Sequence, residues 1–152
     1  MLYLLLALDA DRYALNAGAI VEVVPLVALK AIPQAPHGVA GILNYRGTPV
    51  PVLDLCALAL GRPARSRLTT RIVLVDYTDR RGAAHVLGLI AERVEGTLRC
   101  EPDAFRAYGI DNAGTPYLGP VVEDAQGLIQ RVEIAHLLPD AVQRMLFPEL
   151  AA

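Results

Sequence analysis

Apolar residues in this chain come in short runs that are separated by turn-forming residues at regular spacing. The first run, residues 2–8, is continuously apolar, which indicates a strand buried on both faces. Runs of this length with Gly, Pro and Asp between them favour strands over helices. The pattern predicts strands over residues 2–8, 13–16, 20–24, 42–45, 50–53, 70–77, 84–91, 93–99, 117–122 and 128–132.

Two short helices are predicted among these strands. Asp54 is a short polar acid directly before the apolar run 55–60, which is a typical N-cap position, and Gly61 follows as a stop signal. A second helix is expected over residues 141–147, and the basic stretch 62–68 is expected to be an exposed connector. Many short strands with few helices are typical of small barrels, which close and so hide their edges.

The two halves of the chain resemble each other. The dipeptide Val-Glu follows a hairpin and a strand at positions 21–22, and again at positions 94–95. Gly47 and Gly127 each precede a strand that ends in an acidic residue and a helical turn. The sequence therefore predicts two similar β-units.

The stretch 41–55, Gly-Ile-Leu-Asn-Tyr-Arg-Gly-Thr-Pro-Val-Pro-Val-Leu-Asp-Leu, reads as strand, tight turn, strand and helix start. Gly47 suits the turn because glycine adopts a positive φ without a steric penalty. Pro49 and Pro51 lack a backbone N–H, and two residues apart in a strand they remove donors from the same edge. That edge is predicted not to pair along its length with a neighbouring strand.

Composition narrows the class of protein. The chain has 152 residues, of which 54% are hydrophobic and 20% charged, so it has ample material for a core and a surface. A formal net charge of −2 gives no electrostatic argument for binding nucleic acid or an anionic membrane. Cys56 and Cys100 lie far apart without metal-ligand spacing, so two free thiols are expected, as in a reducing compartment. No run approaches the ~20 apolar residues that span a bilayer, and a cytoplasmic soluble protein is expected.

No catalytic constellation is evident in the sequence. His37, His85 and His136 are scattered, and none has a partner at metal-ligand spacing. Asp76 and Asp79 are expected to lie in a turn with solvated side chains. We therefore predict no catalytic site, no cofactor and no metal. A small β-barrel enzyme or ligand sensor would need a deep polar pocket with at least two convergent titratable groups, and a scaffold that binds its own copies is a third alternative.

The run from Gly41 to Leu55 resembles the signature of the CheW-like family, the coupling proteins that join chemoreceptors to the histidine kinase CheA, and the resemblance extends from Leu2 to Leu138. It implies an all-β fold with short helices, in which two small five-stranded SH3-like β-barrels pack together. Residues 1–152 would form a single domain whose two barrels share and exchange terminal strands. The structural residues of the motif are Asn44, Gly47, Pro49, Pro51 and Asp54.

The resemblance also implies where partners bind. The cytoplasmic tip of a methyl-accepting chemoreceptor would enter a groove between the barrels and contact Ile20, Val39, Gly41, Arg46 and Arg71. The regulatory domain of a CheA-like histidine kinase, which has the same fold, would pack barrel to barrel, with Glu22 and the strands over residues 84–99 as contacts. From the residues alone, Arg46 could equally tie the turn to a nearby carboxylate, and Glu22 could equally lie on a solvated strand face.

The implied function is a non-catalytic adaptor for chemotaxis signalling. It would need no cofactor, bind no nucleic acid, and reach membrane receptor arrays from the cytoplasm through its protein partners, without inserting into the membrane. Tyr45 stands where the family usually has Leu, and the connector 62–68 is basic where many members are acidic or neutral. These departures leave open a surface-sensing pathway, such as the Wsp system that drives cyclic-di-GMP synthesis, or a twitching-motility pathway.

Overall fold

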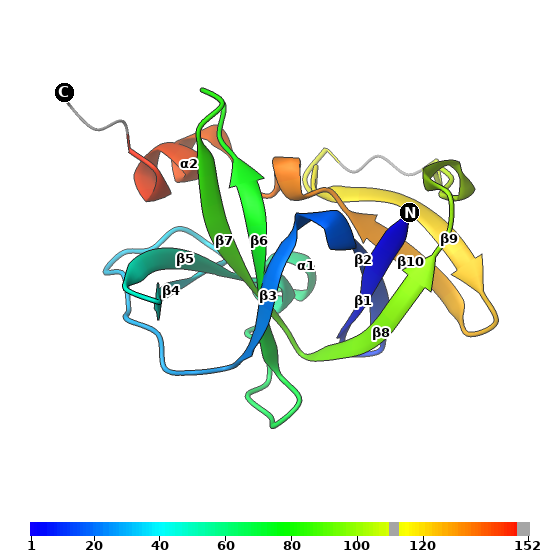
Figure 1. Ribbon diagram of the computed structural model, residues 1–152, viewed down its shortest axis with the longest axis horizontal. Helices are drawn as coiled ribbons and strands as arrows, with labels where there is room; N and C mark the ends of the chain where they lie inside the picture. Colours follow the sequence, from blue (N-terminus) through cyan, green and yellow to red (C-terminus); the bar gives the residue numbers. More distant parts are fainter. Residues whose placement is uncertain (110–112, 149–152) are drawn as a thin grey trace.

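The computed structural model describes residues 1–109 and 113–148, and it consists mainly of β-strands with two short helices (Figure 1). The strand prediction is confirmed, with bounds that differ by a few residues. The strands are β1 (Leu2–Leu8), β2 (Asp11–Asn16), β3 (Ile20–Pro25), β4 (Val39–Tyr45), β5 (Thr48–Asp54), β6 (Arg71–Thr78), β7 (Ala84–Ala91), β8 (Arg93–Arg99), β9 (Leu118–Asp124) and β10 (Gly127–Val132). The helices are α1 (Leu55–Leu60) and α2 (Asp140–Leu146), with single 3-10 turns η1 (Ala17–Ala19), η2 (Pro102–Ala104) and η3 (Ile134–His136).

The strands form two five-stranded sheets that repeat one topology. The order β8-β1-β2-β10-β9 makes a barrel-like unit that we call the terminal barrel, and β3-β6-β7-β5-β4 makes the inserted barrel. In the terminal barrel, the β1–β2 hairpin pairs antiparallel with β8 and parallel with β10. In the inserted barrel, the β6–β7 hairpin pairs in the same way with β3 and β5. The hairpin of each half of the chain therefore completes the sheet formed by the other half.

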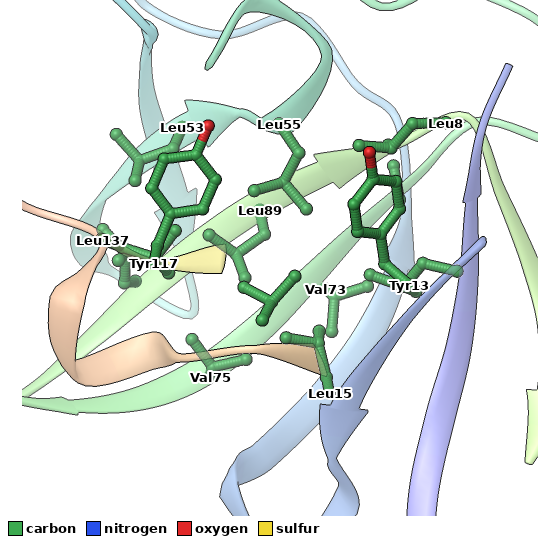
Figure 2. Close-up of a cluster of buried hydrophobic side chains, with 14 of the residues drawn as sticks. Leu8, Tyr13, Leu15, Leu53, Leu55, Val73, Val75, Leu89, Tyr117 and Leu137 are labelled. Carbon is green, nitrogen blue, oxygen red and sulfur yellow. The ribbon is translucent and has the colours of Figure 1, made fainter. Parts of the chain in front are cut away.

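The two units contain three apolar clusters. One lies inside each barrel, and the largest is shared between the barrels (Figure 2). The prediction that the first strand is buried on both faces is confirmed, because Leu5 belongs to the terminal barrel's own cluster while Leu6 and Leu8 belong to the shared cluster. The labelled members of the shared cluster in Figure 2 are Leu8, Tyr13, Leu15, Leu53, Leu55, Val73, Val75, Leu89, Tyr117 and Leu137.

Asp54 caps the first helix as the sequence predicts. Its Oδ1 accepts hydrogen bonds from the amides of Cys56, at 2.9 Å, and Ala57, at 3.2 Å. Its Oδ2 accepts from the amide of Ala64 at 2.8 Å, so the same carboxylate also holds the connector that follows the helix. Gly61 ends the helix in the left-handed conformation, with φ of 71°.

The effect predicted for the two prolines is confirmed. β5 pairs with β7 only where Val52 lies opposite Gly88 and through the two residues that follow. Pro49 and Pro51 precede this segment and take no part in that pairing. Because a proline cannot donate to the ladder, β5 and β7 separate upstream of Val52, and the inserted barrel stays open at this end.

The expectation that Asp79 is solvated was wrong. Its side chain is 1% exposed, and its Oδ1 accepts from the amides of Arg81 and Ala83, both at 2.9 Å. Its Oδ2 lies 2.7 Å from Nε2 of His85, and this hydrogen bond lowers the pKa of Asp79. The carboxylate therefore shapes the β6–β7 turn from inside. Asp76 is exposed as expected, but it lies on β6 and not in the turn.

The basic connector is less free than its composition suggested, because Glu92 anchors it. Glu92 is only 8% exposed and accepts hydrogen bonds from the amides of Asp9 and Arg65, both at 2.7 Å. The guanidinium of Arg62 binds it through two nitrogens at 3.0 Å. These hydrogen bonds, above all those from Arg62, lower the pKa of Glu92 to about 2. Glu92 thus ties together the β1–β2 turn, the connector and the end of β7.

Candidate docking surface

The β4–β5 hairpin turn presents Arg46 to solvent. Arg46 and Gly47 have φ of 51° and 85°, which is the pattern of a type I′ turn. The Oδ1 of Asn44 accepts a hydrogen bond from the amide of Gly47 at 2.9 Å and fixes this conformation. The Arg46 side chain is 75% exposed, and its guanidinium lies 5.1 Å from the centre of the Tyr45 ring.

Arg46 forms an ion pair with Glu22 on β3, with 2.9 Å between Nη2 and Oε1. The pair connects β3, the first strand of the inserted sheet, to the hairpin of β4, the last strand, so it spans the closure of the barrel. An ion pair this exposed contributes little to stability, at most about 1 kcal/mol. The structure therefore joins two residues that the resemblance assigns to different partners.

An apolar strip lies on the outward face of β3 and on the loop that follows. Val21 is 42% exposed, Val23 38% and Val27 48%. The other exposed large hydrophobic side chains in the described part of the chain, Met1, Leu68, Leu128 and Met145, lie on other elements. Sequence periodicity could not have found this strip, because its valines alternate with Glu22, the polar side chain of β3, and Glu22 is the half-buried residue.

The other residues that the resemblance implies for the receptor do not form one patch. Ile20 and Val39 are half-buried and pack against the shared cluster. Gly41 is buried with φ of 151°, and a Cβ there would lie 2.6 Å from the carbonyl oxygen of Lys30. Gly41 therefore allows close packing of β4 against the backbone of Lys30 and offers no side chain to a partner.

Arg71 lies at the end of the β3–β6 ladder that is remote from Ile20. It pairs with Pro25, whereas Ile20 pairs with Val75. The Arg71 guanidinium donates to the carbonyl oxygen of Leu68, and to that of Thr70 at 3.1 Å, so it also ties down the end of the connector.

The strands over residues 84–99 do not offer one continuous face. β7 belongs to the inserted sheet and β8 to the terminal sheet. The segment 87–91 is buried in the core, while every residue of β8 is exposed or half-buried. Of this stretch, only β8 and the first residues of β7 are available for a partner.

The part of the chain that the structure describes contains neither a disulfide nor a group of metal-ligating side chains. Cys56 and Cys100 are free, and burial raises the pKa of the Cys56 thiol to about 12, which keeps it protonated. Within residues 1–109 and 113–148, no group of three or more His, Cys, Asp or Glu side chains could hold a metal ion. No helix in those ranges is long and apolar enough to cross a membrane.

Two packed five-stranded β-barrels that repeat one topology define the class of fold to which this chain belongs. The sequence model of the CheW-like domain family matches residues 2–142 of this chain, and the chain belongs to the CheW-like family. Its fold is similar to that of the scaffolding protein TtCheW from Thermoanaerobacter tengcongensis, with a TM-score of 0.82 and 22% sequence identity over 95% of this chain and 92% of that one. A comparison with curated protein sequences finds no match.

Proposed function

We propose that this CheW-like protein is a non-catalytic adaptor that couples methyl-accepting chemoreceptors to a CheA-like histidine kinase. The observation that carries the proposal is the exposed apolar strip on β3, next to the Arg46–Glu22 ion pair. Exposed valines on a strand at the edge of a sheet are costly unless a partner covers them. Coupling here means that the adaptor binds one state of receptor and kinase more tightly than the other.

The kinase regulatory domain would cover β3. Glu22 lies on this strand, and Val21 and Val23 supply apolar area for a second barrel to bury. In the family the regulatory domain has the same fold, so its contact would pack one barrel against another. β8, which is largely exposed, is available for a second contact of the same kind.

The receptor tip would bind near the junction of the barrels. Ile20 and Val39 lie half-exposed against the shared cluster, so an apolar helix that contacts them would sit between the two units. Arg46 would supply an exposed cation, and Arg71 would supply a second cation further along the inserted barrel. Gly41 would contribute indirectly, because it allows the backbone of β4 to pass close to Lys30. The adaptor would work in the cytoplasm and join membrane receptor arrays through these partners alone.

The test is a titration of Arg46→Ala against a receptor cytoplasmic hairpin and a kinase regulatory domain. We expect affinity for at least one partner to fall about tenfold or more, as for a hot-spot arginine, while Tm changes little because the Arg46–Glu22 pair is exposed. Arg80→Ala is the matched control, since Arg80 is also an exposed arginine in one ion pair, with Asp140 at 2.8 Å.

Two outcomes contradict the proposal in different ways. If the wild-type chain binds neither partner at micromolar concentration, it does not couple them. If Arg46→Ala unfolds the protein, Arg46 has a structural role and the contact residues must be sought elsewhere.

A further inference from the structure

The open end of the inserted barrel contains a cavity of about 660 Å³. It lies where β5 and β7 separate, and the end of α2 forms its third wall. Its size is within the range of about 300–1,000 Å³ that is typical of small-molecule sites, which often lie at the mouths of β-barrels. The lining is mainly apolar, and its principal side chains are Ile42, Pro49, Pro51, Val86, Met145 and Phe147.

The α2 wall is fixed to the β6–β7 hairpin, beside which it lies in Figure 1. Gln143 donates through Nε2 to the hydroxyl of Tyr77 at 2.7 Å, and its Oε1 accepts from the amide of Arg80 at 2.9 Å. Phe147 stacks on His85, with 4.0 Å between ring centres and 17° between planes. The cavity is therefore formed before any ligand arrives, which lowers the entropic cost of binding.

The polar groups of the cavity are mostly hydrogen-bond acceptors. Asp76 on β6 is exposed at its wall, and its carboxylate makes no hydrogen bond or ion pair with any residue in the described ranges. Pro49 and Pro51 remove two amide donors from the β5 wall. Asp79 is ionised and can only accept, so His85 donates its Nε2–H to Asp79 rather than to a ligand. Among the lining side chains, only the hydroxyl of Thr48 remains as a free donor.

We propose that this cavity binds a small amphipathic amine, whose apolar or aromatic body fills the space between β5, β7 and α2 and whose ammonium group pairs with Asp76. A lone carboxylate within an apolar lining selects a ligand with one positive charge. The ring of Phe147 supplies an aromatic surface for the ligand body. This inference concerns a different part of the molecule from the β3 strip and does not depend on the proposed function.

The experiment compares three probes of the same shape by following backbone amide signals in NMR titrations. The probes are 2-phenylethylamine, the neutral 2-phenylethanol and the anionic 3-phenylpropionate. We expect signals of cavity residues to move with the amine at millimolar concentration, about threefold to fivefold tighter than with the alcohol, as an accessible ion pair allows. The acid should bind most weakly, and the preference for the amine should shrink as salt is added.

Asp76→Asn should remove the preference for the amine over the alcohol. Asp103→Asn is the matched control, because Asp103 is an exposed acid on η2 in the other barrel, outside the cavity. Ala84→Phe, which places a ring in the cavity, should weaken all three probes. The proposal is overturned if the alcohol binds as tightly as the amine, if Asp76→Asn keeps the preference, or if no cavity signal moves.

Discussion

The two barrels share one strand order but differ at their open ends. In the inserted barrel the β6–β7 hairpin extends back to the Thr78–Ala84 pair, whereas β5 joins β7 only at Gly88. In the terminal barrel the β1–β2 hairpin ends at the Leu8–Asp11 pair, and β10 joins β2 at the next residue, Arg12. The inserted barrel therefore has an unpaired overhang on β7 that the terminal barrel lacks.

Different chemistry accompanies the two ends. Arg12 on β2 makes a bidentate ion pair with Asp124 at the end of β9, at 2.7 and 2.8 Å. This interaction clamps the terminal barrel and lowers the pKa of Asp124 to about 2. At the inserted barrel, Pro49 and Pro51 prevent pairing and the cavity remains. Two barrels with the same strand order can thus differ at one end, which an ion pair closes in the terminal barrel and two prolines without backbone N–H groups keep open in the inserted barrel.

The largest effect is expected from substitutions in the shared cluster, which test whether the two barrels unfold as one unit despite their different ends. Leu15→Ala and Leu89→Ala remove fully buried side chains of the shared cluster, one from each sheet. Each should lower the free energy of unfolding by about 2–5 kcal/mol, and amides of both barrels should lose protection together in hydrogen exchange. Leu128→Ala, at a side chain that is 61% exposed, should change stability by less than about 0.5 kcal/mol. Persistent protection in one barrel would show that the barrels unfold separately.

Glu92→Gln tests the anchor that links the terminal barrel's hairpin turn to the connector. Loss of charge-assisted hydrogen bonds should cost about 1.5–3 kcal/mol at neutral pH in urea unfolding. The pKa of Glu92 is about 2 in the folded chain against a usual 4.5, so its stabilisation is complete above the usual value and is lost as pH falls toward 2. The variant should therefore lose less stability in acid than the wild type. Glu101→Gln, an exposed acid, should follow the wild-type pH curve, and a Glu92→Gln curve with an unchanged acid slope would exclude this role.

A smaller effect is expected where the helical turns of the two halves begin. Asp54→Ala removes the cap of α1 and should cost about 0.5–2 kcal/mol without changing partner binding. Glu133 is the counterpart before η3 but makes no capping hydrogen bond, so Glu133→Ala should cost less than about 0.5 kcal/mol. Equal losses in thermal unfolding would mean that the two positions are equivalent after all.

The smallest effect on stability is expected from Pro51→Val, although it bears most directly on the open end. The new amide restores a donor toward β7, and stability should change by less than about 0.5 kcal/mol. The backbone amide introduced at position 51 would itself report closure by exchanging slowly with solvent. Pro33→Val, in the loop before β4, is the control and should give a rapidly exchanging amide. If both new amides exchange rapidly, another feature, such as the α2 wall, holds the strands apart.

Features set by neighbouring residues were predictable from the sequence, and features set by distant partners were not. The Asp54 cap, the hairpin turn at Gly47 and the proline edge each depend on a few adjacent positions. The anchoring role of Glu92 was not predicted, because the groups that donate hydrogen bonds to its carboxylate belong to Asp9, which is 83 residues away, and to two arginines of the connector. Among the receptor residues implied by the resemblance, Arg46 is exposed and Gly41 is buried, a difference that only the three-dimensional packing reveals.

The exchange of hairpins has a consequence for synthesis on the ribosome. Every strand of the inserted barrel lies between Ile20 and Ala91, so that sheet can assemble once these residues have left the exit tunnel. The β1–β2 hairpin, which is made before the other strands of the two sheets, must wait for β8 and β10 before its two edges are paired. Of the strands in the two sheets, those synthesised first are thus the last to be fully paired. A ribosome stalled after Ala91 would leave an apolar hairpin open to aggregation or to chaperones.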